Sequence, residues 1–321
     1  MKFLKKLSIH LFILAGLIYL PWVVKSQYYL HIIIMSGISV LLASSMNLIT
    51  GCTGRLNLGH AAFYGIGAYS STLLVMKLGL PVWVAMFLSG LVTTLFGVLI
   101  GVPCLKLKGS YLAITTLAFG EITRLALMNL IDLTNGPIGI RGIPGPSPIA
   151  LSNSLAISFE SKTSYYYLLL TFCLICLLII RRILRSQIGL TFIAIREDEI
   201  RAETVGIDTT HIKIMNFALG AFFAGIAGSF YAHYVRFISP DTFTLSETFN
   251  ILTMVVVGGL GTFWGPILGG VIFTFLPELL RPIAEYRMMI YGIMISVTII
   301  FMPEGIIGLF HSLIPRRRGK E

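Results

Sequence analysis

Long apolar segments recur along almost the whole of this 321-residue chain. A helix needs about 20 apolar residues to cross the hydrocarbon core of a bilayer, and about ten segments approach that length. They lie at 8–24, 29–50, 59–76, 82–103, 110–131, 165–180, 214–235, 248–262, 265–280 and 287–302. Charged residues make up only 12% of the sequence, about half the share that a soluble domain needs to face water. The sequence therefore predicts an all-α polytopic membrane protein, a single transmembrane domain over 1–321 in which some spans are short or broken.

The positions of Lys and Arg predict the orientation of these spans. If the N-terminus lies in the cytoplasm, most of the 24 Lys and Arg residues fall in cytoplasmic connections, as the positive-inside rule requires. An even number of spans then places both termini in the cytoplasm, and topology accounts for the net charge of +10 without nucleic-acid binding. The first apolar run follows a basic start, as in a secretory signal peptide. It lacks a small-residue cleavage site, however, so we expect it to be retained as a span.

Two connections between the predicted spans are long. Residues 132–164 fall outside the cytoplasm and are rich in Gly, Pro and Ser, which predicts an ordered, turn-rich extracytoplasmic loop or a short surface helix. Residues 181–213 fall inside and contain a helix-forming stretch, 196–203, with dense charge of both signs. A charged element between two spans can protrude and dock on a soluble partner; a solvated loop is the alternative.

Two glycine-rich stretches stand out against the apolar background. The first, 51–69, has glycines at 51, 54, 59, 65 and 67. It indicates either tightly packed helices or a broken helix that borders a translocation path, with Asn57 and His60 exposed to that path. The second, 257–270, has a similar place in the other half of the chain and suggests an internal duplication.

Glu121 and Arg124 lie inside the predicted span 110–131. At a spacing of three they share one helix face and can form an ion pair. Charged side chains within the bilayer usually face a protein interior or a water-filled cavity, so the pair is either structural or part of the path. The sequence shows no other acid in the middle of a span, which argues against a proton-coupled carrier.

The sequence gives no positive sign of an enzyme. It contains no P-loop of the form G-x-x-x-x-G-K-[ST], so this chain cannot cradle nucleotide phosphates in that way. It also lacks H-E-x-x-H, G-x-S-x-G and any cluster spaced as metal ligands. Cys173 and Cys176 form a C-x-x-C within an apolar run, where packing is the expected role. We therefore expect a transport subunit without a metal or cofactor of its own.

Several blocks of the sequence resemble the branched-chain amino-acid ABC permeases. They are 54–69 (GRLNLGHAAFYGIGAY), 116–125 (TLAFGEITRL) followed by 133–140 (LTNGPIGI), 194–207 (AIREDEIRAETVGI), 222–228 (FFAGIAG) and 257–262 (VGGLGT). The second block is closer to the M-type subunits of that family than to the H-type subunits. Together the blocks cover residues 50 to about 270 in the family's order.

The resemblance implies a bacterial cytoplasmic-membrane importer with several partners. These are a second, H-type permease subunit, two ABC ATPase subunits that bind the ATP, and an extracytoplasmic amino-acid-binding protein, in addition to the surrounding lipid. It further implies that the 194–208 region couples this chain to the ATPases, with Gly206 permitting a sharp exit. The coupling residues would be Arg196, Glu197, Asp198, Glu199, Arg201, Ala202, Glu203 and Gly206. The family's Ala-rich run before this glycine reads Arg-Ala-Glu-Thr here, a departure that affects the docking contacts.

The residues expected at the translocation path, or in helix packing beside it, come from the glycine-rich stretches and the intramembrane pair. They are Gly54, Asn57, Gly59, His60, Gly65, Glu121, Arg124, Gly258, Gly259 and Gly261. The resemblance leaves urea, short amides or other amino acids as alternative cargoes. A secondary transporter driven by an ion gradient is the alternative from another class, but it would leave the charged cytoplasmic segment unexplained.

Overall fold

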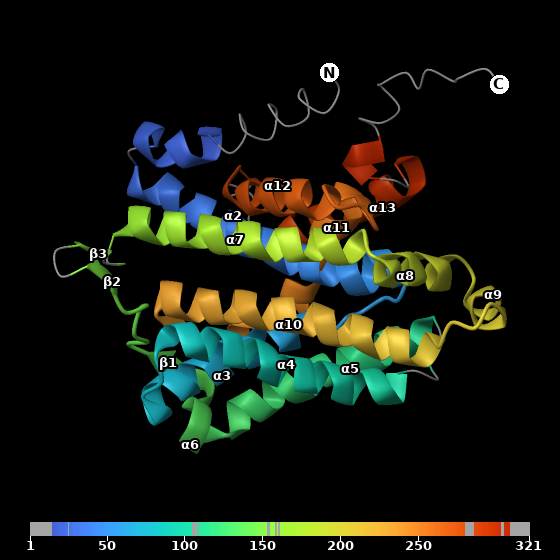
Figure 1. The fold of residues 1–321 in the computed structure, drawn as a ribbon, viewed down its shortest axis with the longest axis horizontal. Coiled ribbons are helices and arrows are strands. Elements are labelled where there is room, and N and C mark those ends of the chain that lie inside the picture. Colours follow the sequence, from blue (N-terminus) through green and yellow to red (C-terminus); the bar gives the residue numbers. More distant parts are fainter. Residues whose placement is uncertain are drawn as a thin grey trace.

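The computed structural model describes residues 15–24, 26–104, 107, 109–152, 155–157, 159, 161–279, 286–302 and 305–308. Long helices lie side by side along one axis, with short β-strands at one end and two short helices at the other (Figure 1). The long helices are α2 (Gln27–Met46), α3 (His60–Leu78), α4 (Val82–Cys104), α5 (Ser110–Asn129), α7 (Lys162–Leu184), α10 (Thr209–Val235), α11 (Leu245–Gly259), α12 (Gly265–Leu279) and α13 (Arg287–Phe301).

The shorter elements connect these helices. A π-helix (Asn47–Gly51) extends α2, and α8 (Gln187–Glu197) and α9 (Glu199–Thr204) follow α7. The loop after α5 contains α6 (Ile131–Thr134), a 3₁₀ turn (Gly136–Ile138), β1 (Ile140–Arg141), β2 (Ile149–Ser152) and β3 (Leu155–Ile157). After α10 come β4 (Phe237–Ile238) and a second 3₁₀ turn (Pro240–Thr242). β1 pairs with β4 and β2 with β3, both antiparallel. The predicted turn-rich loop at 132–164 is thus ordered where the structure describes it.

The prediction of an all-helical membrane protein agrees with the length of these helices. In the described part of the chain, five helices are long and apolar enough to cross a membrane, namely Gln27–Gly51, Val82–Pro103, Ser110–Asn129, Lys162–Leu184 and Thr209–Val235. Two more apolar helices, Gly265–Glu278 and Met289–Thr298, are shorter. Part of the predicted span 8–24 lies outside the described residues. A total of ten spans, and the orientation of the termini, therefore stay predictions.

Two helices extend beyond the predicted spans, and both reach into the connection 181–213 that the sequence places in the cytoplasm. Helix α7 continues to Leu184, and α10 begins at Thr209. Asp208 caps α10, because its carboxylate accepts a hydrogen bond from the backbone N–H of His211 at 3.0 Å. Because the connection is rich in charged residues, its apolar pattern did not indicate where α10 begins. Outside the two helices the connection narrows to residues 185–208.

Helix α10 is the centre of the bundle, and it packs against α2, α3 and α4 (Figure 1). Small residues allow the close approach. A Cβ added to Gly225 would lie 2.7 Å from the Cβ of Thr93 in α4, and one added to Gly228 would lie 2.9 Å from the backbone nitrogen of Ala68 in α3. Without a hydrophobic driving force between helices in lipid, such close backbone contact stabilises the bundle.

The chain folds back between α2 and α3. After the π-helix, one more helical turn ends at Thr53, and residues 54–59 are not helical. The Nε2 of His60, the first residue of α3, lies 2.8 Å from the Oγ of Ser45 in α2, so α3 starts beside the body of α2 rather than below its end. Residues 54–59, which are called the re-entrant segment from here on, form a non-helical connection between α2 and α3.

Candidate functional site

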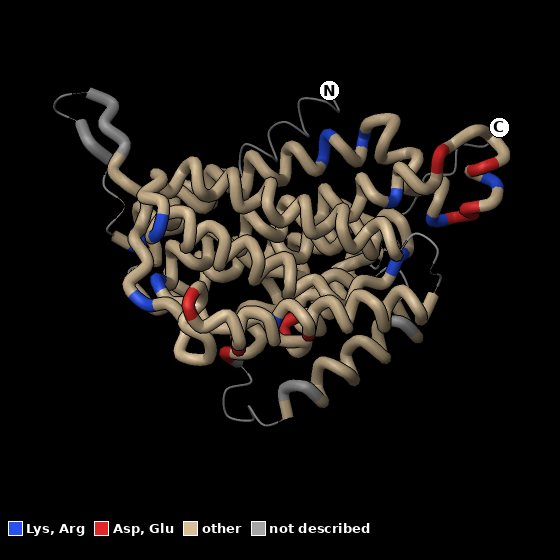
Figure 2. The backbone as a smooth tube through the Cα atoms, turned by 90° about the horizontal axis from the view of Figure 1, so that it is seen from below, with Lys and Arg blue, Asp and Glu red and all other residues tan. Residues whose placement is uncertain are grey.

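The helices α8 and α9 project from the end of the bundle opposite the β-strands and gather charges of both signs (Figure 2). Asp198 separates them. Its extended backbone (φ −159°, ψ 106°) ends α8, and its carboxylate caps α9 by accepting from the backbone N–H of Arg201 at 3.1 Å. Gly206 ends this pair with φ +86°, a left-handed conformation that favours glycine. This geometry matches the sharp exit that the resemblance implied for Gly206.

One face of α8–α9 is open. Glu197, Asp198, Arg201 and Val205 border a shallow pocket of about 360 Å³. The side chain of Arg201 is 87% exposed, and the apolar side chains of Ile200 and Val205 are 67% and 76% exposed. Exposed apolar residues beside charges are typical of an interaction surface. Ile200 and Val205 were not predicted as coupling residues, because the prediction rested on the charged residues of this segment.

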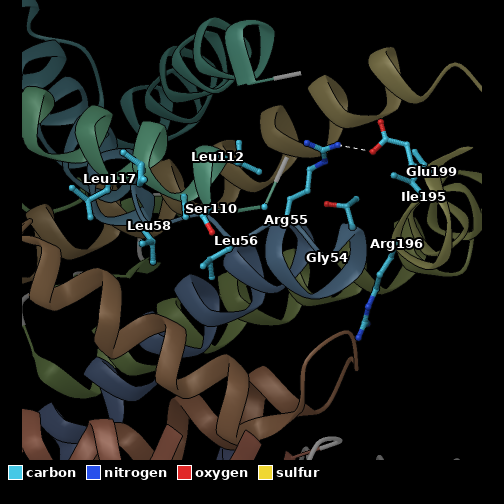
Figure 3. Close-up of a pocket in the computed structure, with 14 residues that line it drawn as sticks. Gly54, Arg55, Leu56, Leu58, Ser110, Leu112, Leu117, Ile195, Arg196 and Glu199 are labelled. Carbon is cyan, nitrogen blue, oxygen red and sulfur yellow. Dashed lines mark hydrogen bonds and ion pairs between the residues drawn. The ribbon is translucent and has the colours of Figure 1, made fainter. Parts of the chain in front are cut away.

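The other face of α8–α9 contacts the bundle. Glu199 accepts from Nη2 of Arg55 at 2.9 Å and from Nζ of Lys213, and Arg55 also donates to the carbonyl oxygen of Leu107 at 3.1 Å. The side chains of Arg55 and Lys213 are only 10% and 4% exposed. We call Arg55, Glu199 and Lys213 the buried cluster. Figure 3 shows the Arg55–Glu199 contact.

The other predicted coupling residues divide between the two faces. Arg196 reaches inward, since its Nη1 donates to the carbonyl oxygen of Gly51 at 2.7 Å. Ala202 is buried. Glu203 accepts from the hydroxyl of Thr209 at 2.7 Å and so holds the turn between α9 and α10. Docking on a soluble partner therefore stays a prediction for the exposed members of the set, and the inward members connect α8–α9 to the bundle.

Asn57 and His60 do not face a path. Both are buried, at 1% and 0% exposure. His60 lies 2.8 Å from Ser45, and the side-chain oxygen of Asn57 accepts from the backbone N–H of Gly59 at 3.0 Å. The expectation that they are exposed is wrong, because Asn57 binds the backbone of the re-entrant segment and His60 joins the start of α3 to α2. Thr248 also binds backbone, since its hydroxyl accepts from the backbone N–H of Ala61 at 3.1 Å.

Two cavities lie along α5. The inner cavity, of about 580 Å³, is lined by the re-entrant segment, the first half of α5 and the inward face of α8–α9 (Figure 3). The central cavity, of about 180 Å³, lies further along α5. It is lined by Leu58, Ala61, Leu117, Gly120, Glu121, Phe243, Thr244, Leu245 and Thr248. Leu58 and Leu117 line both cavities, so these two side chains form an apolar partition between them.

One aromatic side chain, Phe243, lines the central cavity and belongs to an aromatic cluster. The ring of Phe243 lies 5.0 Å from that of Tyr64 and 6.0 Å from that of Tyr69, both edge to face. Such arrangements are favoured by the quadrupoles of the rings. A Cβ added to Gly65 would lie 2.9 Å from the ring of Phe243, so Gly65 is a packing residue for this cluster. Leu58, Leu117 and Phe243 thus form an apolar part of the wall of the central cavity.

The predicted Glu121–Arg124 pair forms beside the central cavity, which Glu121 lines and Arg124 does not. The Nε of Arg124 lies 3.1 Å from both carboxylate oxygens of Glu121, and its Nη1 lies 3.7 Å from Oδ1 of Asp241. The side chains of Glu121 and Arg124 are 43% and 21% exposed in the isolated chain. Asp241 was not predicted as a partner, because its distance along the sequence gives no sign of the contact.

The two glycine-rich stretches meet at the end of α2. Asn47 accepts from the backbone N–H of Gly261 at 2.8 Å and donates to the carbonyl oxygen of Thr262 at 2.9 Å. A Cβ added to Gly261 would collide with the guanidinium of Arg196. Close packing also accounts for other predicted glycines. Gly59 packs against Thr116, and Gly258 and Gly259 pack against Gly265. Gly54 instead lines the inner cavity, where its φ of +68° turns the chain.

The long apolar helices define the class of polytopic helical membrane proteins. The sequence profile of the family described as "Branched-chain amino acid transport system / permease component" matches residues 28–300. The chain belongs to this family.

Individual relatives agree with the family and with its M-type branch. The chain is 36% identical over 303 residues to the high-affinity branched-chain amino acid transport system permease protein LivM of Salmonella typhimurium, covering 89% of this chain and 71% of that protein. It is 34% identical over 302 residues to LivM of Escherichia coli strain K12, with the same coverage. LivH of that strain is 23% identical over 282 residues, covering 84% of this chain and 90% of LivH. No solved structure matches.

Proposed function

We propose that this chain is one permease subunit of an ATP-driven importer that moves branched-chain amino acids across the bacterial cytoplasmic membrane by alternating access. The names of the M-type and H-type relatives support this cargo and a second permease subunit. Two ATPase subunits would bind and hydrolyse the ATP, and an extracytoplasmic binding protein would deliver the substrate. This chain contributes the path, not the chemistry of hydrolysis.

The observation that carries the coupling role is the double-faced geometry of α8–α9. Its open face, with Arg201, Ile200 and Val205, suits docking on a soluble partner. Its other face holds the re-entrant segment through Glu199 and Arg55. A displacement of α8–α9 by closing ATPases is therefore transmitted to residues 54–59.

The re-entrant segment would convert this displacement into access. It carries Leu58, one half of the partition between the inner and central cavities. Moving Leu58 away from Leu117 would join the two cavities and open the central cavity to the cytoplasm. Rearrangement of packed elements between two discrete states is the usual basis of such switching.

The test is purification of this chain from its native membrane, followed by uptake assays in liposomes. We expect a second multispanning permease and P-loop ATPases to co-purify, and the complex to take up leucine only with ATP and the loaded binding protein. Competition by urea, short amides or other amino acids identifies an alternative cargo. Uptake by this chain alone, without ATP, would overturn the proposal in favour of an ion-coupled secondary transporter.

A further inference from the structure

We infer that the central cavity, which Glu121 lines and beside which Arg124 pairs with Glu121, is an intramembrane binding site for a zwitterionic α-amino acid with an aliphatic side chain. Glu121 binds the α-ammonium group, Arg124 binds the α-carboxylate, and the cavity accepts the side chain. The inference rests on the proposed function and assigns a substrate-binding role to residues of this chain.

The position of the pair is the first argument. Glu121 lies near the middle of the 20-residue helix α5, in a window of which only 28% is buried within the chain. A charged side chain in the middle of a bilayer is costly unless it faces protein or water. The uncovered face of α5 must therefore face a water-filled path or a second subunit rather than lipid.

The incomplete pairing of these charges is the second argument. A carboxylate has about four lone-pair sites, yet within the described residues the hydrogen bonds of the Glu121 carboxylate come from Arg124 alone. The Nη1 of Arg124 has only the sulfur of Met128 at 3.1 Å and the distant Asp241 at 3.7 Å. Both groups retain capacity for a ligand.

The sign of the charges selects the ligand. A lone cation approaching Glu121 is repelled by Arg124, and a lone anion approaching Arg124 is repelled by Glu121. A zwitterion satisfies both, because its ammonium and carboxylate can each replace part of the contact between the two side chains.

The shape and lining of the cavity select the side chain. Its volume of about 180 Å³ is small, and Leu58, Leu117 and Phe243 form much of its wall. Such a space favours a compact aliphatic group and disfavours a charged one. This apolar part of the wall suits an occluded intermediate, in which the substrate is shielded from both sides of the membrane.

The test uses the complete transporter in vesicles with its loaded binding protein. Glu121→Gln should lower leucine uptake about ten- to a hundred-fold, the factor that a hydrogen bond to a charged group supplies. Assembly of the complex and ATP hydrolysis stimulated by the binding protein should persist. The matched control is Ile122→Ala, whose side chain is 65% exposed on the same helix and lies outside the set that lines the cavity.

A charge exchange separates binding from structure. The double variant Glu121→Arg with Arg124→Glu keeps an ion pair on α5 but reverses its polarity. A purely structural pair would regain leucine uptake in this variant, and that result would overturn the inference. Continued loss of uptake in an assembled complex supports it.

Direct occupancy is measured by thiol labelling of Thr244→Cys and of Leu245→Cys in the assembled complex, with the labelling of the unmodified complex as the background. Leucine should slow the labelling, whereas 4-methylpentanoate, which lacks the ammonium, and 3-methylbutylamine, which lacks the carboxylate, should not. Equal protection by all three compounds, or by none, would overturn the inference. If the unmodified complex shows no ATP-dependent leucine uptake, the proposed function fails instead, so the two failures are distinguishable.

Discussion

The two charged clusters of this permease differ in how completely the protein covers them. In the buried cluster, Glu199 holds two cations whose side chains are almost inaccessible, at the junction of the re-entrant segment, α8–α9 and α10. In the central pair, Glu121 and Arg124 are partly exposed, and their polar contacts are mainly with each other. A charged cluster whose hydrogen bonds are all made within the protein suits a rigid connection. A pair with spare hydrogen-bonding capacity suits recognition of a ligand. The difference indicates that one cluster transmits force and the other receives a ligand.

The largest effect is expected from the buried cluster. Glu199→Gln leaves Arg55 and Lys213 with no compensating charge at this position, and breaking a buried pair in this way costs about 3–5 kcal/mol. We expect a lower thermal midpoint of the purified complex and a loss of uptake. Glu197→Gln, on the exposed side of the same segment, is the control for stability. Equal midpoints for the two variants would remove the distinction between the clusters.

A matched pair of glycines tests the connection to α8–α9. Gly206 and Gly79 have φ of +86° and +66°, and neither has a heavy atom within 4 Å of an added Cβ. Alanine at either position therefore costs about 1–2 kcal/mol of backbone strain. Only Gly206→Ala should also uncouple ATP hydrolysis from uptake, because only Gly206 ends the coupling helices. Uncoupling by Gly79→Ala as well would show that strain alone causes the defect.

The partition between the cavities gives a third test. Leu58→Ala removes apolar contact worth about 1 kcal/mol and widens the passage from the central cavity to the inner one. We expect faster efflux of preloaded leucine from vesicles in the absence of ATP. Leu56→Ala, at an exposed position of the same segment, should leave efflux unchanged. If vesicles with Leu58→Ala lose preloaded leucine no faster than vesicles with the unmodified complex, the barrier lies elsewhere.

The smallest effect on stability is expected at the central pair. Since Glu121 is 43% exposed, Glu121→Gln should change the free energy of unfolding by no more than about 1 kcal/mol, even where uptake falls strongly. Thermal unfolding of the complex measures this. If Glu121→Gln destabilises the complex as much as Glu199→Gln does, the Glu121–Arg124 pair is structural and the two charged clusters do not differ in role.

The sequence allowed the prediction of features that depend on local pattern. Apolar length gave the helices, the spacing of three gave the Glu121–Arg124 pair, and glycine density gave the break before α3. It did not reveal the buried cluster, because Arg55 and Glu199 are far apart along the chain and meet only through the fold. The prediction for Asn57 and His60 failed for a related reason: polar residues in a membrane protein suggest a path, but here Asn57 binds the backbone of Gly59 and His60 contacts Ser45 of α2.

The partition by Leu58 and Leu117 has an electrical consequence. Each elementary charge that crosses a membrane potential of 100 mV releases about 2.3 kcal/mol, so an open water column through an importer would discharge the cell's main energy store. Two apolar side chains between the cavities interrupt that column. Because the barrier is made of side chains on a short segment, a small displacement opens it and a small return restores the insulation.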